Sequence, residues 1–230
     1  SLVLSIGFFV APSGKPGTPL RCKDMLLISL LLLLFSIGAK AVYVLGMRND
    51  SLSFINTLAV GYPVAGAVGL VAMVFAARRY CTMALLLSFF TMLMFQAPFS
   101  LFLLHFLGGM LATWLVTNAQ SRQDVVWSIV PLTIGQSIIW FGATLLAHSA
   151  PGVMPMQLLA VFINSVLSLI LLFAVSPVLE ISFGYSTRFR LMELMSLEQP
   201  LMQELMVTVP GTYHHSLVVA NMVEAGAKAI

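Results

Sequence analysis

Apolar runs of about twenty residues each restrict the fold of this chain more than any other feature. Wound as a helix, such a run crosses a hydrocarbon core of about 30 Å. Lipid offers the backbone no hydrogen bonds, so runs of this length are typical of transmembrane helices. The composition agrees, because 60% of the 230 residues are hydrophobic and only 8% are charged. The sequence therefore predicts an all-α integral membrane protein that lies in a lipid bilayer.

We predict a polytopic bundle of seven transmembrane helices within residues 1–178. The spans are 1–11, which is truncated at its start, 25–46, 54–77, 81–97, 99–117, 125–147 and 156–178. Only Gln96, Ala97 and Pro98 separate the fourth span from the fifth, so these two are either separate spans or one re-entrant hairpin. Since the chain starts inside an apolar run and ends inside a helical pattern, we expect it to be part of a longer protein.

The basic residues predict how the chain is oriented in the membrane. One set of loops and ends holds Lys15, Arg21, Lys23, Arg78, Arg79, Arg122, Arg188 and Arg190, whereas the opposite loops offer only Arg48, with Lys40 near that end of its helix. Cytoplasmic loops carry an excess of Lys and Arg, so the N-terminus is predicted outside and the C-terminus inside the cell. Cys22 and Cys81 then lie on the reducing side, where a structural disulfide is not expected.

The scattered basic residues and the net charge of +3 argue against DNA or RNA as a partner.

Small and polar residues inside the predicted spans indicate helix packing. The set comprises Gly61, Ala65 and Gly69 at intervals of four residues, the helix-loosening Pro63 and Pro131, and the hydrogen-bonding Gln136, Asn164, Ser165 and Ser168. A ligand cavity within the membrane is the alternative. His105 is a functional candidate because it is ionisable and lies within a span. No acidic partner is evident in any span, so we interpret it as a neutral imidazole bonded to a neighbouring helix.

Residues 179–209 are predicted to be linker helices that follow the last span. Ser186 or Thr187 could cap a first short helix, and Pro200 suits the first turn of a second one. The apolar face of the second helix would consist of Leu201, Met202, Leu205 and Val209. Such helices either couple the bundle to a following domain or lie on the membrane surface.

A final amphipathic helix is predicted over 210–230, with Thr212 as its N-cap. Its buried stripe would consist of Val219, Met222, Val223, Gly226, Ala227 and Ile230. His215 falls on this stripe, four residues before Val219, whereas His214 is displaced by about 100°. His215 is therefore expected to point into the domain interior. A buried imidazole needs a metal, a carboxylate or a backbone carbonyl as its partner, and the spacing leaves these open.

The run PVLEISFGYSTRFRLMELMSLEQPLMQELMVTVPGTYHHSLVVANMVEAGAKAI, with PGTYHHS as its most specific part, resembles the seven-transmembrane-receptor HD-hydrolase family. This resemblance implies a seven-helix bundle followed by a cytoplasmic HD phosphohydrolase domain, whose N-terminal helix would be 210–230. It also implies that His215 is the first metal ligand and that His214 is not one. Val209, Gly226 and Lys228 depart from the family pattern at positions away from this ligand.

No His-Asp doublet occurs in the chain, and the only aspartates are Asp24, Asp50 and Asp124. The other ligands of an HD site are therefore expected beyond Ile230, and this stretch alone is expected to be inactive.

The resemblance implies that the intact protein is a signalling phosphodiesterase of the bacterial inner membrane. Its substrate would be a cyclic dinucleotide, cyclic di-AMP, and an extracellular signal would act through the bundle. Its cofactors would be two divalent metal ions, manganese or iron, which lower the pKa of a bridging water. Alternatives are a non-catalytic sensor with a degenerate HD domain and a transporter, which the scarcity of charge in the spans disfavours. Association into a homo-oligomer stays open.

Overall fold

The computed structural model describes residues 22–47, 52–75, 77–119, 121–146, 154–183 and 200–228. Every regular element in these ranges is an α-helix, which confirms the all-α prediction. The chain divides between Thr187 and Arg188 into two compact units. The first unit holds the apolar helices, and the described part of the second holds two further helices.

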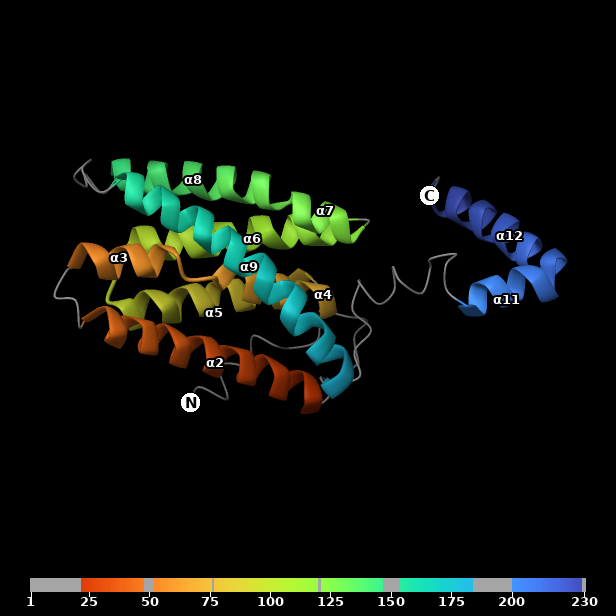
Figure 1. The fold of residues 1–230 in the computed structure, drawn as a ribbon, viewed down its shortest axis with the longest axis horizontal. Helices are drawn as coiled ribbons and strands as arrows, with labels where there is room; N and C mark the ends of the chain where they lie inside the picture. Colours follow the sequence, from red (N-terminus) through yellow and green to blue (C-terminus); the bar gives the residue numbers. More distant parts are fainter. Residues whose placement is uncertain are drawn as a thin grey trace. The chain divides into compact units, whose positions relative to one another are not determined.

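The helices of the first unit run lengthwise beside one another and reverse direction from one span to the next (Figure 1). They are α2 (Cys22–Met47), α3 (Leu52–Val60), α4 (Val64–Val74), α5 (Ala77–Phe95), α6 (Phe99–Asn118), α7 (Arg122–Trp127), α8 (Ile129–Leu146) and α9 (Met154–Phe183). Five stretches among the described residues are long and apolar enough to cross a membrane, namely Asp24–Met47, Phe54–Val74, Phe99–Asn118, Arg122–Leu145 and Pro155–Ser182; Tyr80–Phe95 is a shorter apolar helix. These six match the second to seventh predicted spans, so the chain is a multi-pass membrane protein. The first predicted span, 1–11, lies outside the described residues.

A tight turn joins α5 to α6. Gln96 has a φ of 51°, and the amide of Ala97 donates to the carbonyl of Met92 over 3.1 Å. The apolar part of α5, Tyr80–Phe95, is about 24 Å long at 1.5 Å per residue, somewhat shorter than a hydrocarbon core of about 30 Å. It packs along α2, α4 and α6. These contacts favour two separate spans over the re-entrant hairpin.

The third predicted span is two helices, α3 and α4, separated by residues 61–63. Pro63 has no N–H to donate to the carbonyl of Ala59, four residues earlier. The amide of Val64 donates to Tyr62 over 2.9 Å, so the carbonyl of Val60 loses its helical donor as well. The predicted loosening at Pro63 is confirmed as a complete break. A similar interruption at Ser128 separates α7 from α8, three residues before Pro131.

Small residues let α4 approach α9 closely. A Cβ added to Gly66 would lie 2.6 Å from the carbonyl oxygen of Ser168, too near for any side chain. One added to Gly69 would lie 3.0 Å from Leu172, and Ala65 is fully buried. The packing role predicted for the small residues of this span is confirmed, and Gly66 belongs to the same set.

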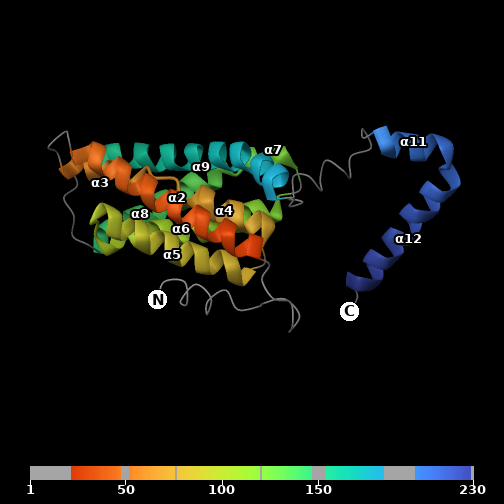
Figure 2. The same ribbon diagram turned by 90° about the horizontal axis from the view of Figure 1, so that it is seen from below.

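Basic residues occur where the bundle helices begin. Lys23 lies in the first turn of α2, Arg78 and Arg79 in that of α5, and Arg122 opens α7. Figures 1 and 2 show that these three starts and the end of α9 gather at the same end of the bundle. Arg78 and Arg79 were expected in a loop, but α5 begins at Ala77 and includes them. The last helix also continues to Phe183, past the predicted end of the span at 178.

The second unit contains α11 (Pro200–Thr208) and α12 (Pro210–Lys228). Pro200 opens α11, as predicted. The prediction that Thr212 caps the final helix is wrong: α12 already begins at Pro210, whose fixed φ suits a first helical position. The carbonyl of Val209 accepts the amide of Tyr213 over 3.1 Å, which places Thr212 within the first turn. The short helix expected after Ser186 or Thr187 lies outside the described residues.

Candidate functional site

The two histidines of the sequence motif lie near the start of α12. Both His214 and His215 are exposed. The stripe predicted to be buried beside His215 is also exposed, with Val219 at 42% and Met222 at 69%. Within the described residues of this unit α12 packs mainly against α11, which leaves that face uncovered. The expected difference in burial between the two histidines is therefore not seen.

Metal binding needs several ligands, and His215 offers one. Among the residues that the structure describes, no three His, Cys, Asp or Glu side chains come together. A zinc-like site takes three or four protein ligands, and a single exposed imidazole does not fit that requirement. The described part of the chain does not by itself form the predicted metal centre, and the assignment of His215 as a ligand stays a prediction.

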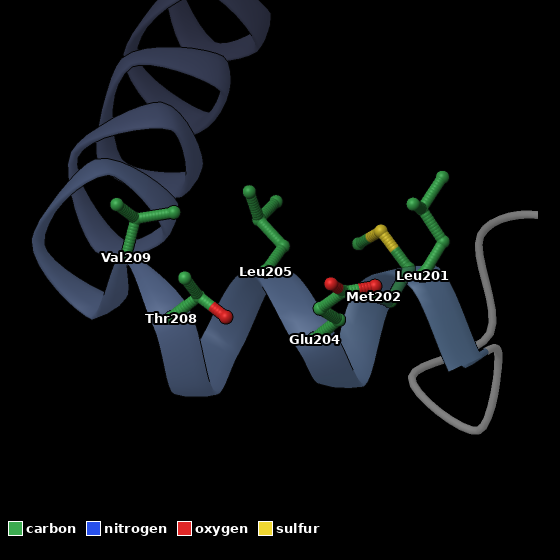
Figure 3. A pocket seen from close by; sticks show the side chains of 6 residues that line it. All are labelled: Leu201, Met202, Glu204, Leu205, Thr208 and Val209. Atoms are coloured by element: carbon green, nitrogen blue, oxygen red, sulfur yellow. The ribbon is translucent and has the colours of Figure 1, made fainter.

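An apolar face on α11 precedes the histidines. Figure 3 shows Leu201, Leu205 and Val209 projecting from the same side of the helix, at intervals of four residues. With Met202, Glu204 and Thr208 they line a hollow of about 430 Å³. This confirms the apolar face predicted for the second linker helix. The face is open, since Leu201 is 76% exposed, and it carries a single carboxylate, so it offers surface for packing rather than a set of reacting groups.

A second candidate site is the buried polar cluster inside the bundle. Asn164 of α9 lies at its centre and is fully buried. Its Nδ2 donates to the carbonyls of Val60 and Tyr62, both over 2.8 Å. Its Oδ1 accepts from the hydroxyl of Ser168 at 3.3 Å. Both amide protons therefore bond to carbonyls at the α3–α4 break. The carbonyl of Val60 is the one that lacks its usual helical donor.

His105 of α6 also bonds to a backbone carbonyl near the α3–α4 break. Its Nε2 lies 3.1 Å from the carbonyl of Ala59. Pro63 cannot supply the usual helical donor to this carbonyl, which also accepts from the amide of Tyr62 over 3.3 Å. A carbonyl only accepts, so Nε2 carries the proton. The side chain is 2% exposed. The interpretation of His105 as an imidazole bonded to a neighbouring helix is confirmed.

Polar contacts extend from this cluster to α8. The hydroxyl of Ser165 lies 3.3 Å from Oε1 of Gln136, and both side chains are buried. Gln136 packs against α6 at Gly108, where an added Cβ would lie 2.8 Å from Nε2. The polar residues predicted for helix packing are thus used for packing, and each one described above is bonded to protein atoms. Their arrangement holds the broken helix in place.

Sequence reasoning missed Tyr62. Its hydroxyl donates to the carbonyl of Phe35 in α2 over 2.7 Å, and its ring packs at 6.0 Å against Phe35 and at 5.9 Å against Phe95. The residue fixes the break to α2 and α5. Its position between Gly61 and Pro63 was the available signal, since this triplet marks a turn inside an apolar run.

Comparisons with known proteins identify the family to which the chain is similar. The family model described as "7TM receptor with intracellular HD hydrolase" matches residues 1–187. A stretch of 63 residues is 40% identical to the cyclic-di-AMP phosphodiesterase PgpH of Bacillus subtilis, and 56 residues are 46% identical to the protein of that name in Listeria monocytogenes. A stretch of 120 residues is 31% identical to an uncharacterized protein of Synechocystis.

These relatives are much longer than the matched stretches. The matches cover 27% and 24% of this chain but only 9% and 8% of the two phosphodiesterases, and 52% of this chain but 12% of the Synechocystis protein. No solved structure matches.

Proposed function

The chain belongs to the family of 7TM receptors with an intracellular HD hydrolase, and we propose from this premise that the full-length protein is a membrane-anchored phosphodiesterase that hydrolyses cyclic di-AMP. The observation that carries the proposal is the local identity, 40% and 46%, to two cyclic-di-AMP phosphodiesterases. In this proposal residues 1–178 are the transmembrane domain, 179–209 the linker and 210–230 the first helix of the HD domain.

We assign to His215 the role of a ligand to one divalent metal, manganese or iron. Helical phase supports the choice of His215 over His214, because only His215 shares a face with Val219 and Met222. That face is exposed in the described part of the chain, so it is free to receive further helices of an HD domain. The other ligands must come from those helices, since the described residues supply no cluster of their own.

We propose that the protein lies in a bacterial inner membrane with its C-terminal helix in the cytoplasm. The gathering of helix starts that carry Lys23, Arg78, Arg79 and Arg122 at one end of the bundle supports this orientation, because Lys and Arg are enriched on the cytoplasmic side. α9 ends at this same end. The phosphodiesterase domain would then meet its substrate in the cytoplasm.

We also propose that the bundle regulates hydrolysis through the segment between α9 and α11, in response to an extracellular signal. Helix shifts in the bundle would reach α12 through that short connection. Insertion of six flexible residues after Gly184 should leave basal hydrolysis intact and abolish its dependence on the signal. Unchanged regulation would contradict the coupling.

The hydrolase proposal is tested with the purified full-length protein in phospholipid vesicles. We expect cyclic di-AMP to be cleaved when Mn²⁺ is present, and a chelator to abolish cleavage until the metal is restored. Binding of cyclic di-AMP without cleavage under any divalent metal would favour the non-catalytic sensor. Movement of solute across the vesicle membrane without cleavage would favour the transporter.

The bundle itself gives the transporter little support. Its buried polar side chains described above are bonded to protein, and Lys40 of α2 is exposed and lies 4.8 Å from the centroid of the Tyr43 ring. Transport pathways usually place ionisable groups in the bundle interior, and the one described above, His105, is bonded to the backbone carbonyl of Ala59.

A further inference from the structure

A groove lies beside the α3–α4 break on the outer side of the bundle. It has a volume of about 310 Å³. It is lined by Val42 of α2, by Thr57 and Leu58 of α3, and by Ala160, Ile163 and Leu167 of α9. The break itself, residues 61–63, lies against it. The volume is at the lower end of the range for small-ligand sites, about 300–1,000 Å³.

The walls of this groove are apolar. The nearby polar groups already have protein partners: Asn164 donates both its amide protons to carbonyls of Val60 and Tyr62, and the Tyr62 hydroxyl donates to Phe35. A charged or strongly hydrated ligand would lose its water without gaining hydrogen bonds in return. The groove therefore selects an apolar occupant.

The outer edge of the groove is continuous with the lipid-facing surface. Ile163 is 42% and Leu167 41% exposed, and Leu159 and Ile170, one helical turn beyond them on either side, are 58% and 56% exposed. All four lie on α9 within the apolar stretch Pro155–Ser182, which is long enough to span the membrane. An exposed apolar stripe on a membrane-spanning helix is expected to face hydrocarbon, so an occupant that enters the groove from this edge would be an acyl chain.

The walls of the groove are held in place by contacts within the protein. The Tyr62 ring is held edge-on against Phe35 and tilted against Phe95, and Asn164 holds the carbonyls of the break. Gly61 and Ala160 keep the space between α3 and α9 free of large side chains. Binding into preformed walls costs little ordering of the protein.

We propose that this groove binds one acyl chain of a bilayer phospholipid, which packs against the α3–α4 break. The site is independent of the proposed hydrolase activity, because it lies within the bundle and uses none of the residues of α12. Its occupant touches the break between α3 and α4, so the bound chain would stabilise that break from the membrane side.

The test uses the full chain in vesicles of phosphatidylcholine that carries a photoreactive diazirine in one acyl chain. Labelled peptides are mapped after irradiation. We expect labelling of the recessed residues Thr57 and Leu58 in addition to the surface of α9. In Ile163→Trp the larger side chain closes the groove edge, so labelling of Thr57 and Leu58 should be lost. The matched control is Phe162→Trp, a neighbour that is 48% exposed and does not line the groove, and it should keep that labelling.

Labelling confined to exposed residues such as Leu159 and Phe162 would overturn the proposal, because it shows only the ordinary lipid shell. Equal labelling of Leu58 in Ile163→Trp and Phe162→Trp would also overturn it. A third contrary result would be a crosslink from Leu58 to protein instead of to lipid. If Ile163→Trp fails to fold, Leu167→Trp provides the same closure, with Ile170→Trp as its control. Loss of hydrolase activity in the intact protein has no bearing on this labelling, so the two proposals fail separately.

Discussion

Asn164 bonds α9 to the broken span through both of its amide protons. Replacing it in Asn164→Leu keeps a side chain of similar size but leaves the buried carbonyls of Val60 and Tyr62 without this donor. We expect the free energy of unfolding in detergent micelles to fall by about 1–2 kcal/mol. Asn118→Leu is the matched control, because Asn118 is exposed and bonds only within its own helix. Equal stability of the two variants would contradict the role given to Asn164.

Several residue roles were predictable from the sequence, and others depended on distant neighbours. A neutral, helix-bonded His105 was predictable because the spans offer it no acid. Its partner, the carbonyl of Ala59, was not, because that carbonyl lacks its usual helical donor only where Pro63 breaks the helix, 42 residues earlier in the chain. Helical phase selected His215 over His214. Burial did not separate them, since burial depends on elements that would pack over α12.

The contact between α4 and α9 depends on Gly66. In Gly66→Ala the new Cβ would meet the backbone of Ser168 at 2.6–2.7 Å, so one of the two helices must move. We expect a loss of about 1–3 kcal/mol in the free energy of unfolding. Gly142→Ala is the matched control, because nothing lies within 4 Å of its added Cβ and alanine favours a helix over glycine. A Gly66→Ala protein as stable as the control would contradict the close helix contact.

At the scale of elements, the apolar runs predicted the helices well because length and hydropathy are local properties. The ends were harder to predict. The 54–77 run is mostly apolar along its whole length, so its division into α3 and α4 depended on Pro63 and on hydrogen-bond donors from α6 and α9 that bond to carbonyls at the break. The start of α12 was misplaced because the helix-starting tendency of Pro210 prevailed over the capping tendency of Thr212.

The arrangement of the bundle makes a prediction for the whole molecule in its membrane. In a background with Cys22 and Cys81 changed to serine, Gln123→Cys introduces a thiol at the exposed start of α7, and Asp50→Cys introduces one between the sequence positions of α2 and α3. We expect a membrane-impermeant maleimide to label Asp50→Cys in intact spheroplasts and Gln123→Cys only after lysis. The reverse pattern would place the C-terminal helix outside the cell.

The central claim is that this chain joins a membrane bundle to the first metal ligand of a phosphodiesterase domain. The most direct measurement is the metal content and the cyclic di-AMP hydrolysis of the full-length protein carrying His215→Ala, compared with His214→Ala and the unchanged protein. We expect His215→Ala to lose bound metal and to hydrolyse at least about a hundredfold more slowly while still inserting in the membrane, since even outer partners of metal ligands cost 10–100-fold. His214→Ala should keep its metal. Full metal content and activity in His215→Ala would contradict the claim.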